Sequence, residues 1–182
     1  MTIIGAYCTL YSDPVVCVNV LTLFYRNGRG HELESTLDWV YSCLLCRAYT
    51  DGTLYYPAAE AFLFFLSRLT QSSSSVLQRF KPVYRARERF EVEGDALALA
   101  RRILVAANIG LVCHADVQTL VSMQRDDGSW TTGWIYKFGS SGMLIENDGL
   151  TTTLAMKAVL RLLQTPPYKL PMFQGAQYKA HR

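Results

Sequence analysis

The chain has 182 residues, of which 50% are hydrophobic and 18% are charged. This composition excludes a disordered protein and is sufficient for one globular domain with a sizeable core. The formal net charge is +3, and the positive charge between Arg79 and Arg102 is interleaved with acidic residues, so we expect a solvated helix face there rather than a nucleic-acid-binding stripe.

Residues 1–14 are predicted to form an irregular amino-terminal segment. They lack the basic region of a secretory signal, and Asp13-Pro14 interrupts any long apolar run. The next run, Val15–Tyr25, is far shorter than the ~20 residues that span a bilayer, and its pattern allows either a helix or a strand. We therefore expect a cytoplasmic protein without a transmembrane segment.

Helical spacing begins at Leu33. Apolar residues recur from there at steps of three and four as far as Ala48, and the turn-forming pair Asp51-Gly52 ends this helix. Cys43 and Cys46 match a C-x-x-C pattern inside the helix, but no second ligand pair accompanies them. Small buried side chains are therefore a better account of these cysteines than metal or redox chemistry, and a reducing compartment fits best.

Two further helices are predicted before residue 91. The first starts at Pro57, because proline suits the first position of a helix. Gln71–Ser75 is a polar connection, and a helix around Val76–Phe90 follows it. Pro82 is expected to bend or divide this helix.

Asp95–Asn108 has the clearest helical pattern in the chain. Its apolar residues cover most of the helix circumference and are interrupted by Arg101 and Arg102, which predicts a largely buried helix. Gly110 ends it.

The remaining segments are a short helix, a long loop and a final helix. The short helix is predicted over His114–Met123, and a loop rich in glycine and tryptophan follows over Asp126–Gly149. The final helix, Leu150–Gln164, stops at Pro166-Pro167, and residues 166–182 are expected to form a loose tail.

These elements predict an all-α fold with little strand content. Helices on short turns run antiparallel and stack as αα-hairpins, although no clean repeat period is present. We predict one helical domain over residues 15–165, and the paired layout is what a helical toroid or solenoid requires.

The most specific motif is the segment from Gln124 to Trp130. The amide of Gln124 can hydrogen-bond a neighbouring turn, Asp127-Gly128 reverses the chain, and the Trp130 indole can cover the end of a helix pair. Gln124, Asp127, Gly128 and Trp130 resemble the QW motif of squalene and oxidosqualene cyclases and related terpenoid-cyclase β domains, in which the motif is structural. A paired-carboxylate acid at Asp126 and Asp127 is the alternative, but capping roles suit a turn better.

Other segments extend the resemblance in the same order along the chain. Together they resemble the carboxyl-terminal part of fungal drimane-type sesquiterpene cyclases, in which a haloacid-dehalogenase-like domain is joined to a terpene-cyclase β domain. These segments are Asp13–Asn19, Asp51–Tyr56, Phe62–Arg68, Trp134–Gly142 and Asn147–Ala155. The implied fold is a partial α/α toroid.

The resemblance implies protonation-initiated (class II) cyclisation of farnesyl diphosphate to a drimane skeleton. In the family an aspartate of an Asp-x-Asp-Thr-Thr motif supplies the proton, and a magnesium ion serves the dehalogenase-like domain. This chain contains no Asp-x-Asp, and the phosphatase-like half is missing. We therefore expect a partial gene product, a split partner or a degenerate paralogue that is inactive alone, with no magnesium ligands identifiable in the chain.

A prenyl-binding cavity is still expected, because aromatic faces attract a carbocation without offering it a base. The preferred cavity residues flank loops where helix ends meet: Tyr55, Tyr56, Trp134 and Tyr136. The residues expected to face a diphosphate are Arg29, His31 and Arg68. Core packing for the aromatic residues, and ordinary surface roles for the basic ones, are the alternatives.

Two functions from different classes follow. The first is a terpene-cyclase family member that needs a missing portion or a partner. The second is a non-catalytic toroid remnant that binds a hydrophobic ligand or a protein, or self-associates, through an exposed apolar face. A hydrolase or redox enzyme of another class has little support, because no phosphate loop, catalytic triad or metal-ligand spacing is present.

Overall fold

The computed structural model describes residues 13–87 and 94–163. Three parts of the prediction lie outside these residues: residues 1–12 of the irregular segment 1–14, the end of the third predicted helix beyond Arg87, and the chain from Gln164, with the tail 166–182. The described part contains seven α-helices, which confirms the all-α prediction. They are α2 (Pro14–Arg26), α3 (Glu34–Leu45), α4 (Ala59–Ser72), α5 (Ser74–Arg87), α6 (Ala96–Asn108), α7 (His114–Ser122) and α8 (Asp148–Leu163).

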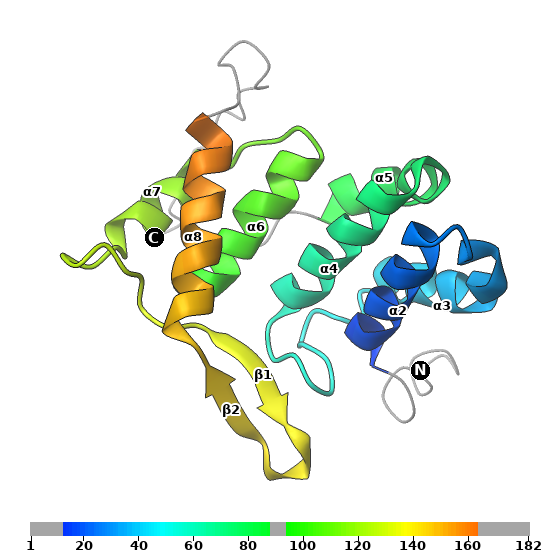
Figure 1. The fold of residues 1–182 in the computed structure, drawn as a ribbon, viewed down its shortest axis with the longest axis horizontal. Coiled ribbons are helices and arrows are strands. Elements are labelled where there is room, and N and C mark those ends of the chain that lie inside the picture. Colours follow the sequence, from blue (N-terminus) through cyan, green and yellow to red (C-terminus); the bar gives the residue numbers. More distant parts are fainter. Residues whose placement is uncertain (1–12, 88–93, 164–182) are drawn as a thin grey trace, which may run out of the picture.

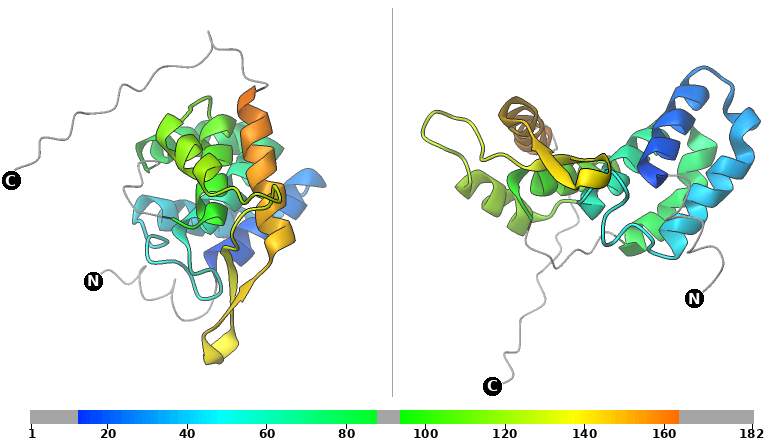
Figure 2. Two further views of the ribbon diagram at one scale, coloured as in Figure 1. Left: turned by 90° about the vertical axis from the view of Figure 1, so that its left-hand side faces the viewer. Right: turned by 90° about the horizontal axis from the view of Figure 1, so that it is seen from below.

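Alternate helices lie side by side in a row. The order is α2, α4, α6, α8, and each of these helices packs on the next (Figure 1). The other three lie outside the row, with α3 on α2, α5 on α4 and α7 on α6 (Figure 2). This is the arrangement that one arc of an α/α toroid requires; the toroid itself stays a prediction.

The four helices of the row begin at the same end of the molecule. Asp13, which precedes α2, accepts a hydrogen bond from the backbone N–H of Tyr55, in the segment before α4, at 3.0 Å. The carbonyl of Tyr55 in turn accepts from the N–H of Lys137 at 2.7 Å, and Asp95, which precedes α6, accepts from the N–H of Trp134 at 3.0 Å. Because these bonds join the amino-terminal ends, the row helices run parallel to one another.

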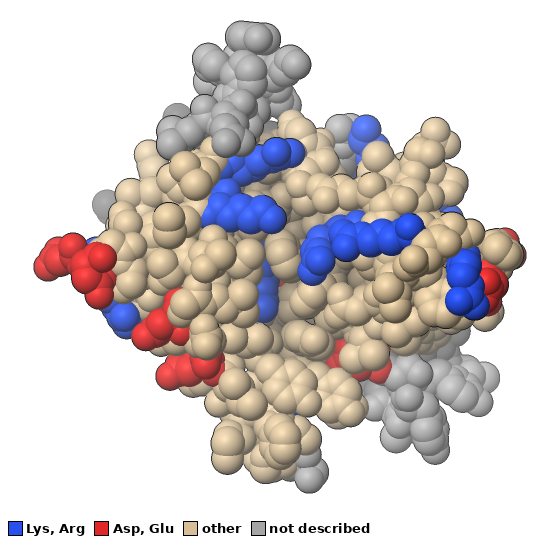
Figure 3. Space-filling model, viewed as in Figure 1, with Lys and Arg blue, Asp and Glu red and all other residues tan. Residues whose placement is uncertain are grey.

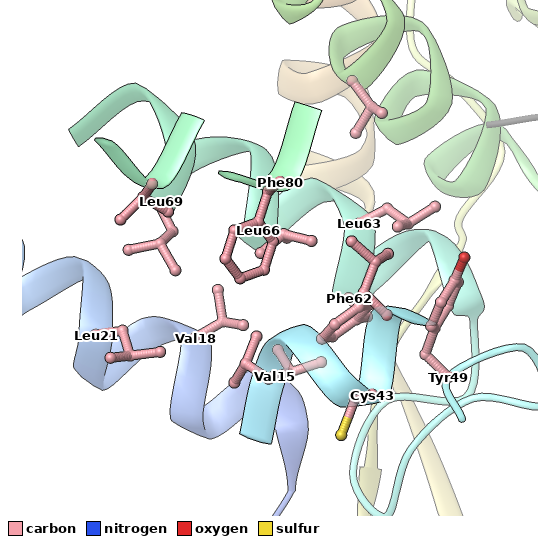
Figure 4. Packing of buried hydrophobic residues seen from close by; sticks show 14 of the residues in the cluster. Val15, Val18, Leu21, Cys43, Tyr49, Phe62, Leu63, Leu66, Leu69 and Phe80 are labelled. Carbon is pink, nitrogen blue, oxygen red and sulfur yellow. The ribbon is translucent and has the colours of Figure 1, made fainter. Parts of the chain in front are cut away.

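The apolar core has two parts, one at each end of the row. The larger part packs α2, α3, α4 and α5 together around Phe62, Leu66 and Phe80 (Figure 4). The smaller part joins α6, α7 and α8 around Ile103, Leu120 and Trp130. The contact of α4 with α6 connects the two parts, so the row is continuous.

The ambiguous run Val15–Tyr25 is helical. Asp13 caps α2 by accepting from the N–H groups of Val15 and Val16 at 2.8 and 3.2 Å, and Pro14 stands at a first-turn position where its missing N–H costs nothing. α6 matches its prediction closely, with Asp95 as the capping residue.

The predicted start of the second helix and the predicted connection after it are wrong. α4 starts at Ala59 rather than Pro57 and runs to Ser72, so only Ser73 separates it from α5, and the polar connection Gln71–Ser75 does not exist as a loop. The serines continue the helices because both flanking segments bury apolar faces, and packing outweighs weak local propensity. Pro82 lies inside α5 without dividing it.

The predicted loop Asp126–Gly149 contains a β-hairpin, which corrects the expectation of a structureless segment. β1 (Trp134–Phe138) pairs antiparallel with β2 (Met143–Glu146). The strands are joined by the 3₁₀ turn η2 (Gly139–Ser141) and by Gly142, whose φ of 68° is one that glycine adopts without strain. The hairpin projects from the amino-terminal end of the row (Figures 1 and 2).

Candidate functional site

A groove of about 680 Å³ lies on the face of the row, and we call it the row groove. All four row helices contribute to it, together with Tyr56 and Ile135, whereas α3, α5 and α7 contribute no residue to its lining. The outer helices are therefore its support, and the row helices are its walls. The polar and apolar side chains along these walls divide the groove into two halves.

The polar side chains of the row groove are basic or neutral. Figure 3 shows Lys and Arg atoms on both sides of a hollow at the centre of this face. The basic residues come from all four row helices: Arg26, Arg68, Arg101, Lys157 and Arg161. Gln71 and Asn108 are the neutral polar residues, and the lining contains no aspartate or glutamate. The groove is therefore suited to an anion.

Arg101 is the buried member of this set. Its side chain rises from the middle of α6 and the residue is 3% exposed. Its Nε has no hydrogen-bond partner, and no ion pair joins its guanidinium to a residue of the described ranges. Burial lowers the pKa of Arg101, and the carboxylates of Asp95 and Glu60 partly oppose that shift.

The neighbouring Arg102 is also buried, but it forms ion pairs with two carboxylates. Its Nε lies 3.6 Å from Glu60, and its Nη1 lies 3.8 Å from Asp116. Asp95 is also occupied elsewhere, since it accepts from the N–H groups of Ala98 and Trp134. The carboxylates nearest Arg101 thus have other partners.

Aromatic rings form the opposite half of the row groove. Tyr56, Phe64 and Phe65 line it, and the rings of Tyr56 and Phe65 meet edge to face with centroids 5.8 Å apart. Tyr136 of the hairpin packs edge to face against Tyr56, with the two ring centroids 6.1 Å apart. Burial, followed by the charge of Asp13, raises the pKa of Tyr56 against the opposing effect of Arg101.

The four predicted cavity residues lie near one another around the start of α4 and the hairpin, but only Tyr56 lines the groove. Tyr55 and Tyr136 stack with ring centroids 5.7 Å apart, and Tyr136 contacts Tyr56. Trp134 is 42% exposed, and it is the adjacent Ile135 that faces the groove.

The three predicted diphosphate residues are not brought together. Arg68 lines the row groove with its guanidinium carbon 6.0 Å from the Phe65 ring centroid. Arg29 forms an exposed ion pair with Glu32 at 2.6 Å, and His31 lies in the exposed turn η1 (Gly30–Leu33); neither lines the groove.

Four basic groove residues escaped sequence reasoning: Arg26, Arg101, Lys157 and Arg161. They lie far apart in the chain and meet only because alternate helices become neighbours. Only Arg101 could have been found from the sequence, because a charged residue in a helix that is apolar on nearly all sides is expected to be buried and to need a partner.

The segment Gln124–Trp130 forms a tight turn between α7 and the hairpin. The Gln124 amide donates to the carbonyl of Gly128 at 3.0 Å, and Asp127 accepts from the N–H and hydroxyl of Ser129 at 2.9 and 2.7 Å. Those hydrogen bonds with Ser129 lower the pKa of the exposed Asp127 carboxyl, which is the opposite of what a proton donor near neutral pH needs.

The Trp130 indole lies under this turn, in the smaller part of the core. It donates from Nε1 to the carbonyl of Leu120 at 2.6 Å, near the end of α7. Its backbone N–H donates to Thr152 of α8 at 3.2 Å. This residue therefore joins α7 to α8.

The described residues do not fit a magnesium site. They contain no group of three or more histidine, cysteine, aspartate or glutamate residues that could hold a metal ion, and the row groove offers no carboxylate, the ligand that Mg²⁺ prefers. Cys43 is buried as expected, but Cys46 is exposed, which corrects its assignment as a buried side chain. No described helix has the length and hydropathy needed to cross a bilayer.

A curated drimenol cyclase of Aspergillus calidoustus is 44% identical to this chain over 151 residues. The match covers 81% of this chain and 29% of that protein, so the chain spans less than a third of its relative's length. No family model and no solved structure matches the chain.

Proposed function

Because the chain is related to the fungal drimane-type terpene cyclases, we propose that it forms part of a terpene-cyclase domain acting in drimane-type sesquiterpene formation. The observation that carries this proposal is the 44% identity, which extends over 81% of the chain. The reaction we propose for the complete domain is protonation-initiated cyclisation of farnesyl diphosphate.

The aromatic half of the row groove supports a role in steering a carbocation. The faces of aromatic rings attract positive charge through their quadrupole and offer no lone pair basic enough to remove a proton early. Tyr56 and Phe65 present such rings, and Tyr136 supports Tyr56 from the hairpin. The phenol of Tyr56 is neutral at physiological pH, and the rise in its pKa disfavours the basic phenolate further.

The proton donor of the proposed reaction lies outside these 182 residues. Asp-x-Asp occurs nowhere in the sequence, and the adjacent pair Asp126 and Asp127 is exposed in a turn and does not line the row groove. The proposal therefore gives this chain the tasks of binding and shaping the prenyl substrate, and leaves protonation to a separate acid-bearing portion.

Incubation of the purified chain with farnesyl diphosphate and Mg²⁺ is expected to yield no bicyclic product. Addition of a separately supplied fragment that carries Asp-x-Asp-Thr-Thr is expected to restore formation of a bicyclic alcohol or diphosphate, measured by gas chromatography with mass spectrometry after phosphatase treatment. The control is the same fragment with the central Asp of that motif replaced by Asn.

Product from the chain alone would refute the division of tasks. Absence of product in the combined reaction, with both parts shown to associate, would refute the cyclase proposal itself. Product that does not depend on the added aspartate would point to an acid within this chain.

A second candidate function is supported by an apolar stripe on α2. Val16, Val20 and Leu23 are exposed, with Leu23 at 60%, and their spacing places them on one face of the helix. Contiguous exposed apolar side chains mark association surfaces. We propose as the alternative that the chain is non-catalytic and acts by binding through this face.

The alternative predicts self-association that depends on the α2 stripe. Light scattering after size-exclusion chromatography is expected to give a mass above 20.5 kDa for the chain and the monomer mass for Leu23→Lys. Val121→Lys, at an exposed position of α7, is the matched control and should leave the oligomer intact. A monomer without affinity for prenyl ligands would count against this alternative.

A further inference from the structure

The row groove combines a basic surface with a cation that the protein itself leaves unpaired. Its lining holds five basic residues and no carboxylate, although the chain as a whole carries 18 basic and 15 acidic residues. Such a local excess of positive charge raises the concentration of anionic ligands in the groove. The excess alone does not define a site, because exposed lysines and arginines are common.

Arg101 supplies the second, independent observation. A buried charge without a partner costs several kcal/mol, and proteins normally pair it or remove it. Arg102, the next residue, follows that rule through its ion pairs with Glu60 and Asp116, whereas no ion pair joins Arg101 to a residue of the described ranges. The buried Nε of Arg101 also has no hydrogen-bond partner. A guanidinium that is buried beside a groove without an ion pair is suited to bind an anion from outside the chain.

Helix dipoles do not explain the position of Arg101. Arg26 and Arg161 stand in the last turns of α2 and α8, where a cation is favoured by the carboxyl-terminal end of any helix. Arg101 lies six positions into a helix of 13 residues, beyond the reach of that effect. Its charge therefore needs a different partner.

The distribution of side chains along the groove indicates the class of ligand. Arg68, Lys157 and Arg161 lie in the carboxyl-terminal halves of their helices, whereas Tyr56 and Ile135 lie at the amino-terminal end of the row. Arg101 lies between these two groups on α6. A ligand that fits has a compact, multiply charged head at one end and an apolar chain at the other.

We propose that the row groove is an amphipathic-anion site in which the guanidinium of Arg101 is the buried anchor for a diphosphate head, with Arg68 and Lys157 at its rim and the apolar chain directed toward Tyr56. This inference deepens the proposed function and rests on it for the prenyl nature of the chain. The site for the head group itself rests on the geometry of Arg101 and its neighbours.

Inorganic diphosphate, measured by isothermal titration calorimetry at constant ionic strength, is expected to bind the full chain. Arg101→Met removes the charge and keeps a similar apolar stem, and it is expected to weaken binding by roughly tenfold or more, which corresponds to ~1.4 kcal/mol. Arg29→Met is the matched control: it makes the same charge change at an exposed arginine paired with Glu32, and affinity should stay within about twofold.

Two further variants keep the test decisive if Arg101→Met fails to fold, as judged by circular dichroism. Arg68→Met and Lys157→Met change exposed side chains at the groove rim, and each is expected to weaken diphosphate binding by roughly threefold to tenfold. Farnesyl diphosphate should bind more tightly than inorganic diphosphate in the original chain, and Tyr56→Ala should reduce that difference.

The outcomes separate this inference from the proposed cyclase function. No diphosphate binding, or an equal loss in Arg29→Met and the groove variants, would overturn the site whatever the cyclisation assay gives. Specific diphosphate binding with no cyclisation in the combined assay would leave the site standing and refute the cyclase function. Orthophosphate binding as tightly as diphosphate would overturn the assignment of a diphosphate head.

Discussion

Replacing Trp130 with alanine is expected to lower the free energy of unfolding by about 3–5 kcal/mol. The side chain is 3% exposed and packs in the smaller part of the core, where it meets α6, α7 and α8. Its removal leaves a cavity and also strips the Leu120 carbonyl of the indole N–H that it accepts at 2.6 Å. Since the free energy of unfolding of a domain of this size is roughly 5–15 kcal/mol, this substitution removes a large share of it.

Two matched variants show which part of the motif provides this stability. Trp130→Phe keeps a buried ring and loses the indole N–H, so a smaller loss of about 1–3 kcal/mol is expected. Gln124→Ala removes an exposed hydrogen bond to the Gly128 carbonyl and should cost about 1 kcal/mol or less. Urea unfolding followed by circular dichroism measures all three. Equal losses for Gln124→Ala and Trp130→Ala would contradict the view that the buried indole is the main brace.

The helices were predictable because each one has a local reason to form. α6 shows this most clearly: Asp95 caps it, apolar residues cover most of its surface, and Gly110 follows it. These signals lie within one stretch of sequence and agree with one another. The order of the helices in the row was not predictable, since it depends on which apolar stripes meet in three dimensions.

The hairpin was missed because its stability comes from distant residues. A two-stranded hairpin is marginal by itself. Here Lys137 donates to the Tyr55 carbonyl and Trp134 donates to the Asp95 carboxylate, so segments some forty to eighty residues away hold β1 in place. Neither partner is visible in the local pattern of β1.

The candidate site was predicted only where a residue stands at a helix entry or on a row helix. Tyr56 precedes α4 and Arg68 lies within it, and both line the row groove. Arg29 and His31 follow α2, at the far end from the hairpin, where local chemistry gave no indication that they face solvent. The shared orientation of four helices decides which cations meet, and no single segment contains that information.

Asp13 is expected to be the polar residue whose loss costs the most stability, with Asp13→Ala lowering the free energy of unfolding by about 2–4 kcal/mol. One carboxylate oxygen accepts from the N–H groups of Val15 and Val16 and caps α2. The other accepts from the Thr53 hydroxyl at 2.6 Å and from the N–H of Tyr55 at 3.0 Å. Alanine removes the cap and leaves both of the latter donors without their acceptor.

The loss of the Asp13 carboxylate also affects the row groove through Thr53, because the Thr53 hydroxyl accepts from the N–H of Tyr56 at 3.2 Å. Asp13→Asn should keep the α2 cap but offers one acceptor oxygen in place of two, so about half of the loss is expected. Thr53→Val should remove both the hydrogen bond to Asp13 and the link to Tyr56, and leave the α2 cap in place. A double-mutant cycle between Asp13→Ala and Thr53→Val, measured by urea unfolding, should give a coupling of about 1 kcal/mol or more. Additive losses would mean that the hydrogen bond between Thr53 and Asp13 contributes nothing to stability. The expected coupling makes Asp13 the residue that fixes the amino-terminal end of α2 against the segment that carries Tyr56 into the groove.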